Sequence, residues 1–94
     1  MIRSYGNRDT ERLAAGEKIR QWEPFRTQAE KRLPILDAAT SLGDFAALNS
    51  NRLEALKGSR KGQHSIRINK QWRICFSWPN DEPGPLNVEI VDYH

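Results

Sequence analysis

The stretch QWRICFSW at residues 71–78 decides the fold, because its apolar side chains recur at every second position. Trp72, Ile74 and Phe76 fall on one face of an extended chain. Arg73 falls on the opposite face. A period of two is typical of a β-strand that is buried on one face only. The stretch therefore predicts a central strand whose apolar face packs on a core and whose other face carries an arginine.

The same period of two continues on both sides of this strand. Apolar and polar side chains alternate over residues 52–56, 65–69 and 88–91. Residues 69–70 form a tight hairpin turn in this interpretation, and the proline-rich segment 79–85 forms a longer loop. Short connections favour antiparallel neighbours, so the second half predicts a meander of three or four strands.

A helical period precedes the meander. Apolar residues spaced by four, four and three positions predict an amphipathic helix from Phe25 to about Ser41. The residues of this stripe are Phe25, Ala29, Leu33 and Leu36. Pro34 lies inside the stripe and removes a backbone hydrogen bond, so we expect a kink there or a break into two helices. Residues 42–44 predict the end of the helical half, and a short turn is expected at residues 45–48.

The start of the chain predicts a strand and a further helix. Met1–Tyr5 alternates in the manner of a short strand. Asn7 or Asp9 can cap a helix that begins near Arg8, and Gly16 weakens or ends that helix. The predicted fold class is therefore α+β: an N-terminal strand, two helices, and then a three- to four-stranded antiparallel meander with the helices packed on one sheet face.

Length and composition restrict the class of protein. The 94 residues predict a single domain, 1–94, whose 37% hydrophobic and 29% charged residues are ordinary for a globular chain. The apolar runs are too short for a bilayer, no signal sequence is seen, and Cys75 is a lone cysteine, so we expect a cytoplasmic protein with no membrane partner. We expect no cofactor and no metal, because metal-ligand spacings and glycine-rich nucleotide loops are both missing from the sequence.

The net charge of the chain is +3, but its excess positive charge is concentrated in one segment. Residues 52–73 contain seven Lys or Arg and a single acid, Glu54, whereas residues 1–51 contain eight basic and seven acidic residues. A block of uncompensated positive charge favours a polyanionic partner such as nucleic acid. The alternative is a solvated strand face with no ligand.

Strand alternation gathers several of these cations on the face turned away from the helices. Arg73 is the outward cation of the central strand, and the connection between the first two strands of the meander carries further basic residues. Arg forks onto a phosphate, and Lys binds it as a point charge. The candidate RNA-binding residues beside Arg73 are Arg60, Lys61, Arg67 and Lys70.

Three groups that exchange protons or donate hydrogen bonds follow the last predicted strand. They are Asp92, Tyr93 and His94. A strand that holds Val88 and Ile90 in the core can keep these groups in place, and an imidazole exchanges protons near pH 7. Residues 92–94 are therefore candidates for acid–base chemistry.

Four short motifs follow one another in a characteristic order. They are Leu53-x-x-Leu56-Lys57-Gly58, Arg60-Lys61-Gly62-Gln63-His64-Ser65-Ile66-Arg67, Trp72-Arg73-Ile74 and Asp92-Tyr93-His94. Their order and spacing resemble the HigB toxins of bacterial toxin–antitoxin pairs, in the RelE/ParE superfamily. The opening Ile2-Arg3-Ser4 and the stretch Leu36-Asp37-Ala38-Ala39-Thr40 fit as well, so the resemblance covers nearly the whole chain. Residues 51–54 and 71–76 also look like a subgroup that includes the slow-growth toxin GraT.

The resemblance implies a RelE-like, microbial-ribonuclease-type fold and an endoribonuclease that cuts messenger RNA in the ribosomal A site. It implies that Lys57 and Arg73 stabilise the scissile phosphate and that Asp92, Tyr93 and His94 supply acid–base and positioning groups. The partners implied are messenger RNA on the 70S ribosome, a helix-turn-helix antitoxin of the HigA or GraA type, and operator DNA reached through the antitoxin.

Glu54 departs from the family pattern, because many HigB toxins carry a histidine at that position. Its carboxylate has two interpretations. It acts as a general base on the 2′-hydroxyl, or it pairs with Lys57 or Arg73 and orders them. In the metal-free mechanism that we expect, His94 oriented by Asp92 transfers the proton, with Glu54 as the other candidate. Tyr93 then positions or stacks a base.

Two other functions remain open from the sequence. ParE toxins share the scaffold but poison gyrase, and a non-catalytic nucleic-acid-binding module or an attenuated toxin would use the same basic segment. The set formed by Lys57, Arg73 and residues 92–94 favours RNA cleavage, because a gyrase poison does not need it.

Overall fold

A computed structural model describes residues 1–49 and 52–93 of the chain. Within these residues the chain forms three α-helices, two short 3₁₀-helices and four β-strands. In chain order they are α1 (Arg8–Ala14), η1 (Arg20–Phe25), α2 (Arg26–Ala38), α3 (Leu42–Asn49), β1 (Leu53–Ala55), η2 (Gly58–Arg60), β2 (Gln63–Arg67), β3 (Trp72–Ser77) and β4 (Leu86–Asp92). Among these described helices, none has the length and apolar character needed to cross a membrane.

The four strands form one sheet in the order β1-β2-β3-β4, and each neighbouring pair is antiparallel. The predicted meander is therefore confirmed, with β3 inside the sheet. The register places Leu53 beside Ile66, Ile66 beside Ile74, and Ile74 beside Ile90. One apolar row thus crosses the whole sheet on the face that alternation assigned to the core.

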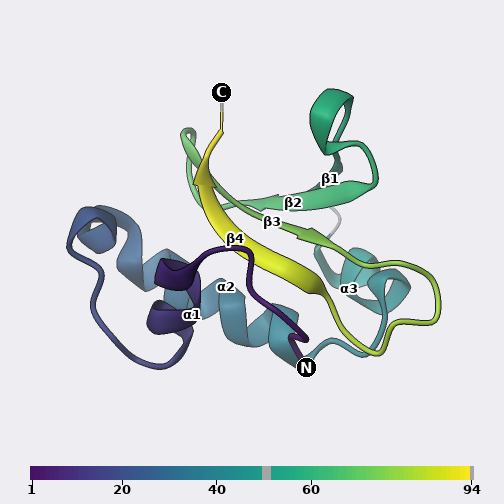
Figure 1. Cartoon of the computed structure of the whole chain (residues 1–94), viewed down its shortest axis with the longest axis horizontal. Helices are drawn as coiled ribbons and strands as arrows, with labels where there is room; N and C mark the ends of the chain where they lie inside the picture. The colour runs from purple at the N-terminus through teal and green to yellow at the C-terminus, as the bar shows by residue number, and fades with distance from the viewer. Residues whose placement is uncertain (50–51, 94) are drawn as a thin grey trace.

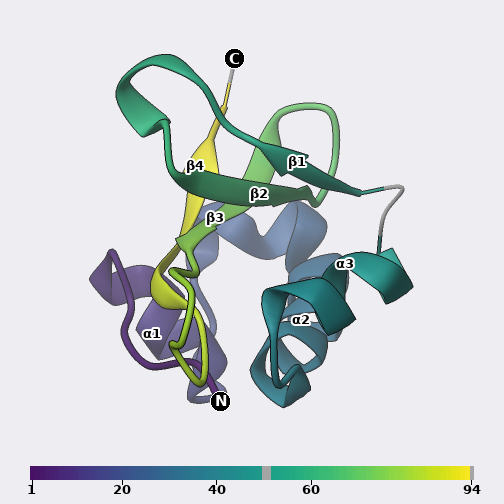
Figure 2. The same ribbon diagram turned by 90° about the vertical axis from the view of Figure 1, so that its right-hand side faces the viewer.

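The helices cover that apolar face and leave the other face of the sheet uncovered (Figure 1, Figure 2). Ile74 and Phe76 of β3 are both 0% exposed. At one end of the sheet, the Trp72 ring lies 5.1 Å from the Phe25 ring and 6.3 Å from the Trp22 ring, measured between centroids. Aromatic packing of this kind joins η1 to β3 and confirms that Trp72 belongs to the core.

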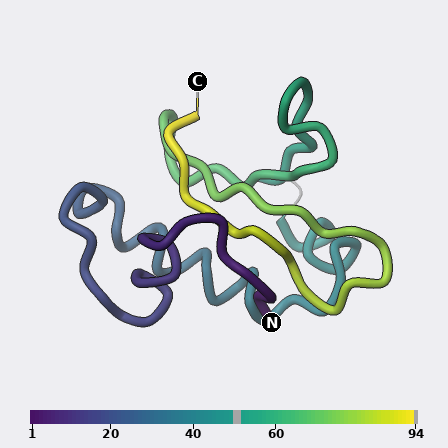
Figure 3. Tube along the Cα trace, viewed as in Figure 1, coloured from purple at the N-terminus to yellow at the C-terminus, as the bar shows by residue number. Residues whose placement is uncertain are grey.

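The predicted N-terminal strand Met1–Tyr5 is not present. The segment runs beside β4 (Figure 3), where Tyr5 makes one isolated parallel bridge, to Val88. Asn87 of β4 has a φ of 54°, which is left-handed backbone. Because β4 is irregular next to the bridge, a regular ladder does not extend along the segment.

The first helix is confirmed together with its cap. α1 follows Asn7, whose Oδ1 accepts a hydrogen bond of 2.9 Å from the backbone N–H of Thr10. Gly16 comes after the helix with a φ of 96°, a conformation that glycine adopts without strain. The Thr10 hydroxyl in turn accepts a 2.8 Å hydrogen bond from the backbone N–H of Ile90, and this bond joins α1 to β4.

The second helix is more continuous than predicted. α2 contains Pro34 without breaking in two, begins just after Phe25 and ends before Ser41. Leu33 and Leu36, which flank the proline, are 4% and 0% exposed. Their packing on the sheet holds both turns in one helix despite the missing backbone hydrogen bond. Of the two alternatives predicted at Pro34, a kink or a break into two helices, the break is therefore wrong, and so is the predicted helix end near Ser41, because α2 ends at Ala38.

The turn predicted at residues 45–48 is also wrong, because these residues belong to α3. The Ser41 hydroxyl accepts a 3.0 Å hydrogen bond from the backbone N–H of Asp44, as an N-cap does. Phe45 is 1% exposed and meets Phe76 edge-on, with ring centroids 6.0 Å apart. The cap and the buried aromatic ring give a third α-helix where the local composition indicated a loop.

Candidate active site

The uncovered face of the sheet carries two rows of paired residues, and we call this surface the open face. One row consists of Glu54, Ser65, Cys75 and Glu89. The neighbouring row consists of Arg67, Arg73 and Val91. Ser65 and Cys75 are 0% exposed although the helices lie on the other side, so longer neighbouring side chains cover them. The open face is therefore covered in part by packed side chains and is not a strand face that is simply exposed to solvent.

Arg73 is held in place from several sides. Its Nη1 donates a 3.1 Å hydrogen bond to Ser65 Oγ and lies 3.2 Å from Glu54 Oε2. Its guanidinium carbon lies 5.0 Å from the centre of the Tyr93 ring, a cation–π distance. The side chain is only 11% exposed. A guanidinium fixed in this way is preorganised to bind an anion with its remaining donors.

The carboxylate of Glu54 is the exposed member of this ion pair, with 58% of its side chain accessible against 11% for Arg73. The geometry agrees with the second interpretation of Glu54, in which it forms an ion pair, and the partner is Arg73. An ion pair so open to water contributes little stability, and the carboxylate can leave at small cost. The general-base role of Glu54 stays a prediction.

The last strand directs its terminal candidates to different sides of the sheet. The backbone N–H of Tyr93 donates a 2.8 Å hydrogen bond to the carbonyl of Gln71, which fixes the chain beyond β4. Asp92 pairs in register with Trp72, so alternation turns it toward the helix-covered side, where its Oδ2 accepts a 2.9 Å hydrogen bond from the Gln71 amide. His94 lies outside the described residues.

Four further basic candidates are exposed: Lys57, Lys61, Arg67 and Lys70. Arg67 pairs directly with Arg73 across β2 and β3, and like charges in such a position favour an anion nearby. Lys57 and Lys61 flank η2. Figure 1 shows that the loop with η2 and the end of β4 both rise on the open side of the sheet. Positive charge therefore borders the open face as the sequence predicted.

Arg60 differs from these cations, because it is already engaged. Its Nη1 lies 3.0 Å from Glu89 Oε1 and donates a hydrogen bond of 3.0 Å to Gln63 Oε1. The sequence reasoning did not single out Glu89. Its alternation with Val88 and Ile90 placed it outward on β4, but nothing in the sequence showed that Arg60 from a distant loop would meet it.

Cys75 lies beneath these charged side chains. Burial raises the pKa of its thiol, Glu89 adds to that shift, and the nearby Arg60 and Arg73 oppose it. A thiol with a raised pKa stays protonated at neutral pH and is a poor nucleophile. The open face therefore offers charge and hydrogen bonds for chemistry, not a cysteine thiolate.

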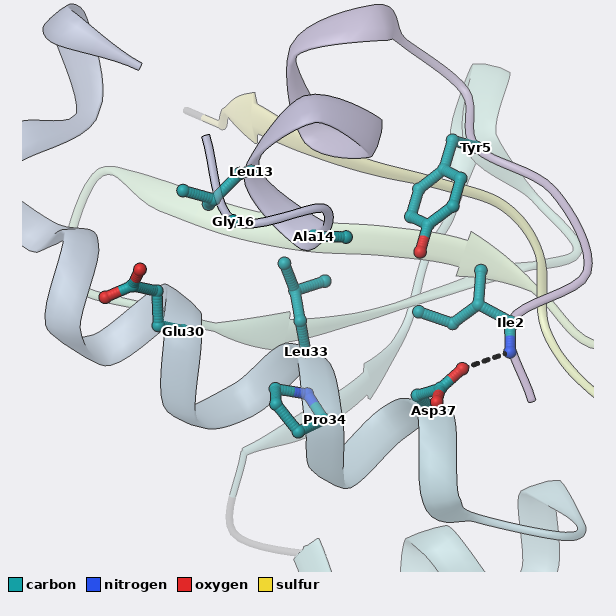
Figure 4. Close-up of a pocket in the computed structure, with 9 residues that line it drawn as sticks. All are labelled: Ile2, Tyr5, Leu13, Ala14, Gly16, Glu30, Leu33, Pro34 and Asp37. Atoms are coloured by element: carbon teal, nitrogen blue, oxygen red, sulfur yellow. Dashed lines mark hydrogen bonds between the residues drawn. The ribbon is translucent and has the colours of Figure 1, made fainter. Parts of the chain in front are cut away.

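Two other features bear on the place of the site: the grouping of possible metal ligands and a pocket on the helical side of the molecule. In the part of the chain that the structure describes, no three His, Cys, Asp or Glu side chains form a group that could hold a metal ion. A pocket lies between the N-terminal segment, α1 and α2, and Figure 4 shows Leu13 and Leu33 on its wall and the Tyr5 hydroxyl directed into it. Because the candidate catalytic and RNA-binding residues do not line this pocket, it is separate from the open face.

The arrangement on the open face suits the binding of a phosphate. A fixed guanidinium, a carboxylate that can move away and an aromatic ring meet at one place, and lysines border it. Groups of this kind are suited to binding a phosphate and to stabilising negative charge on it.

Comparison with known proteins identifies the family to which the sequence is similar. Residues 6–94 match a family described as "RelE-like toxin of type II toxin-antitoxin system HigB". "Toxin HigB-1" of Vibrio cholerae is 48% identical over 48 residues, which cover 51% of this chain and 50% of the relative. "Endoribonuclease HigB" of Proteus vulgaris is 42% identical over 65 residues, which cover 67% of this chain and 65% of the relative.

A protein of Haemophilus influenzae named "Uncharacterized protein" is 28% identical over 64 residues, which cover 68% of this chain and 63% of the relative. The chain thus spans between half and about two-thirds of the length of the curated relatives that it matches.

Proposed function

The chain belongs to the HigB-like family of RelE-type toxins from type II toxin–antitoxin systems, and from that premise we propose that it is an endoribonuclease that cuts messenger RNA on the ribosome. The observation that carries the proposal is the environment of Arg73, which is fixed by Ser65, Glu54 and Tyr93 on the open face. The name of the Proteus vulgaris relative supports cleavage of RNA.

The proposed reaction needs no metal. The 2′-oxygen of the nucleotide attacks the neighbouring phosphorus, and the 5′-oxygen leaves with a proton as a hydroxyl, so that a 2′,3′-cyclic phosphate remains on the other fragment. The reaction needs a base, an acid and cations for the charge on the phosphate. Arg73 and Lys57 stabilise that charge, and the ring of Tyr93 positions the substrate by stacking on a base.

Proton transfer is assigned to His94 with Asp92, although Asp92 turns to the side of the sheet opposite Arg73, and Glu54, which lies beside Arg73, is the other candidate. Glu54 leaves Arg73 when the phosphate arrives, because both compete for the same guanidinium. The carboxylate then lies beside the bound phosphate, within reach of a 2′-hydroxyl. Its exposure of 58% supports this mobility.

The family implies an antitoxin partner, and we propose its type and the other partners in more detail. We infer a GraT-like subgroup from residues 51–54 and 71–76, and a helix-turn-helix antitoxin of the HigA or GraA type. The substrate is messenger RNA on the 70S ribosome, where Lys61, Arg67 and Lys70 contact the backbone. Operator DNA is bound through the antitoxin.

Removal of the Arg73 guanidinium tests the proposal. Arg73→Ala should lower the rate of messenger cleavage on programmed ribosomes by about 10²- to 10³-fold, because a fixed donor to the transition state is lost. Arg73→Lys should recover only part of the rate, since the forked donor is missing. Deletion of His94 should also abolish growth arrest. Arg20→Ala, an exposed arginine of η1, is the matched control that should stay toxic.

Three outcomes would reject the proposal. If Arg73→Ala and the His94 deletion fold normally and still arrest growth as strongly as the parent, the assigned site is wrong. If growth arrest comes with intact messengers and stalled replication, the chain is a gyrase poison of the ParE kind. Binding of RNA without cleavage on ribosomes would identify a non-catalytic module.

A further inference from the structure

The connection between β1 and β2 carries much of the positive charge that borders the open face. Lys57, Arg60 and Lys61 lie in it, around the short helix η2. Lys57 and Lys61 are exposed, whereas the Arg60 side chain turns to the sheet and is only 30% exposed. Arg60 is thus the cation that ties this loop to the sheet.

Arg60 meets its partners on two different strands. Its Nη1 lies 3.0 Å from Glu89 Oε1 on β4 and 3.0 Å from Gln63 Oε1 on β2. Because β3 lies between β2 and β4, the Gln63 and Glu89 side chains reach the same guanidinium nitrogen from strands on either side of β3. A contact of this reach fixes the position of the whole loop relative to the sheet.

The Glu89 carboxylate is itself held in a fixed place. Its Oε2 lies so close to Gly6 that a Cβ atom at that position would come within 2.7 Å of it. The backbone N–H of Gly6 donates a 2.8 Å hydrogen bond to the carbonyl of Val88, which keeps the glycine against β4. The carboxylate is therefore packed between the N-terminal segment and the Arg60 guanidinium.

This ion pair differs from the one between Arg73 and Glu54. The Glu89 side chain is 22% exposed, whereas Glu54 is 58% exposed. A carboxylate with little access to water and close neighbours does not move aside easily for a phosphate. Glu89 also cancels the charge of Arg60, so this guanidinium adds little to the positive field of the open face.

We propose that Glu89 is a positioning residue that holds Arg60, and that this pair fixes the β1–β2 loop so that Lys57 and Lys61 face the RNA. Arg60 is then an anchor and not the phosphate ligand that its charge suggested. The claim that the lysines face RNA rests on the proposed function. The claim that the loop is anchored rests on the ion pair alone.

The anchoring is tested by hydrogen exchange of the free toxin, without RNA. The amides of Arg60 and Lys61 donate backbone hydrogen bonds to Lys57 and Gly58 within the loop. Glu89→Gln and Arg60→Gln should each speed exchange at these two amides at least tenfold, while the core amides of β3 keep their protection. Unchanged exchange at Arg60 and Lys61 would overturn the inference.

The role of Arg60 toward RNA is tested by salt dependence. Binding of a labelled single-stranded RNA is measured over a range of salt concentrations, and each lost phosphate contact lowers the slope of log K against log salt by about 0.7. Lys57→Gln should lower the slope by about that amount. Arg60→Gln and Glu89→Gln should weaken binding but leave the slope unchanged, because the released loop must be ordered again on binding while Lys57 and Lys61 still reach their phosphates. Arg20→Gln should change neither quantity.

A double variant completes the test. Arg60→Gln with Glu89→Gln should lower the rate of messenger cleavage no more than either single change, because both remove the same anchor. The inference is overturned if Arg60→Gln lowers the slope as Lys57→Gln does, if the effects of the two changes add, or if Lys57→Gln leaves the slope unchanged. A parent toxin that binds RNA with these slopes but cuts no messenger would reject the proposed function and leave the anchor in place.

Discussion

At the residue scale, the two arginines of the open face have different neighbours and therefore different roles. Arg73 pairs with a carboxylate that is largely open to water, while Arg60 pairs with one that is mostly covered. A phosphate replaces an exposed partner more readily than a covered one, because the displaced carboxylate regains water at little cost. Local packing, and not residue type, decides which guanidinium is available to a ligand.

Replacement of Glu54 by glutamine tests this competition. Glu54→Gln removes the charge that competes with phosphate for Arg73, so the KM for messenger cleavage should fall by about two- to fivefold, in line with the weak pairing expected of an exposed partner. The control is Glu30→Gln on α2, which should leave the KM unchanged. A rise in KM for Glu54→Gln would contradict the competition. An accompanying loss of kcat of tenfold or more would assign the base role to Glu54.

Gly6 gives a second prediction at this scale. In Gly6→Ala the new Cβ would come within 2.7 Å of Glu89 Oε2 and 2.9 Å of the backbone carbonyl of Asn87. The free energy of unfolding should fall by roughly 1–3 kcal/mol, because the backbone cannot yield easily. Urea unfolding measures the change. Gly43→Ala, whose nearest neighbour lies at 3.9 Å, is the control and should be neutral or slightly stabilising.

At the element scale, buried hydrogen bonds attach the first helix to the last strand. Thr10 is 0% exposed, and its hydroxyl donates a hydrogen bond to Asn7 Oδ1 and accepts one from the backbone N–H of Ile90. The same strand carries Glu89 and leads to Tyr93. The attachment of α1 therefore supports the strand from which two open-face side chains project, although α1 itself lies on the other side of the sheet (Figure 1).

The loss of the Thr10 hydroxyl should be costly. Thr10→Val keeps the shape of the side chain but leaves the buried backbone N–H of Ile90 without its acceptor. The free energy of unfolding should fall by roughly 1–3 kcal/mol in urea or thermal unfolding. Thr27→Val, at an exposed position of α2, should change it by less than about 0.5 kcal/mol. Equal stability of the two variants would show that the Thr10 bond contributes nothing.

At the scale of the whole molecule, the two faces of the sheet have separate roles: one packs the core that stabilises the fold, and the other carries the candidate site. The helices bury one face, so most of the apolar core lies there, and the open face carries the ion pairs of Arg60 and Arg73. The acidic residues Glu54 and Glu89 stand among the cations of residues 52–73 and reduce the charge that a ligand meets. Net charge alone therefore overstates the number of cations available to RNA.

The sequence by itself determined the strands of the meander, the buried face of the sheet and the outward direction of Arg73, because a period of two depends only on local geometry. It also determined the first helix, since Asn7 and Gly16 are local signals. Family motifs, which need only order and spacing, indicated the proposed function.

Tertiary structure alone decided the rest. α3 and the unbroken α2 depend on burial of Phe45, Leu33 and Leu36 against a sheet formed later in the chain, which local propensity does not contain. The N-terminal segment forms only one bridge to β4 and not the predicted strand, because β4 is irregular where the two meet. The contact between Arg60 and Glu89 joins residues that lie far apart in sequence. Alternation gives the face on which a side chain lies, but only the folded sheet gives its partner.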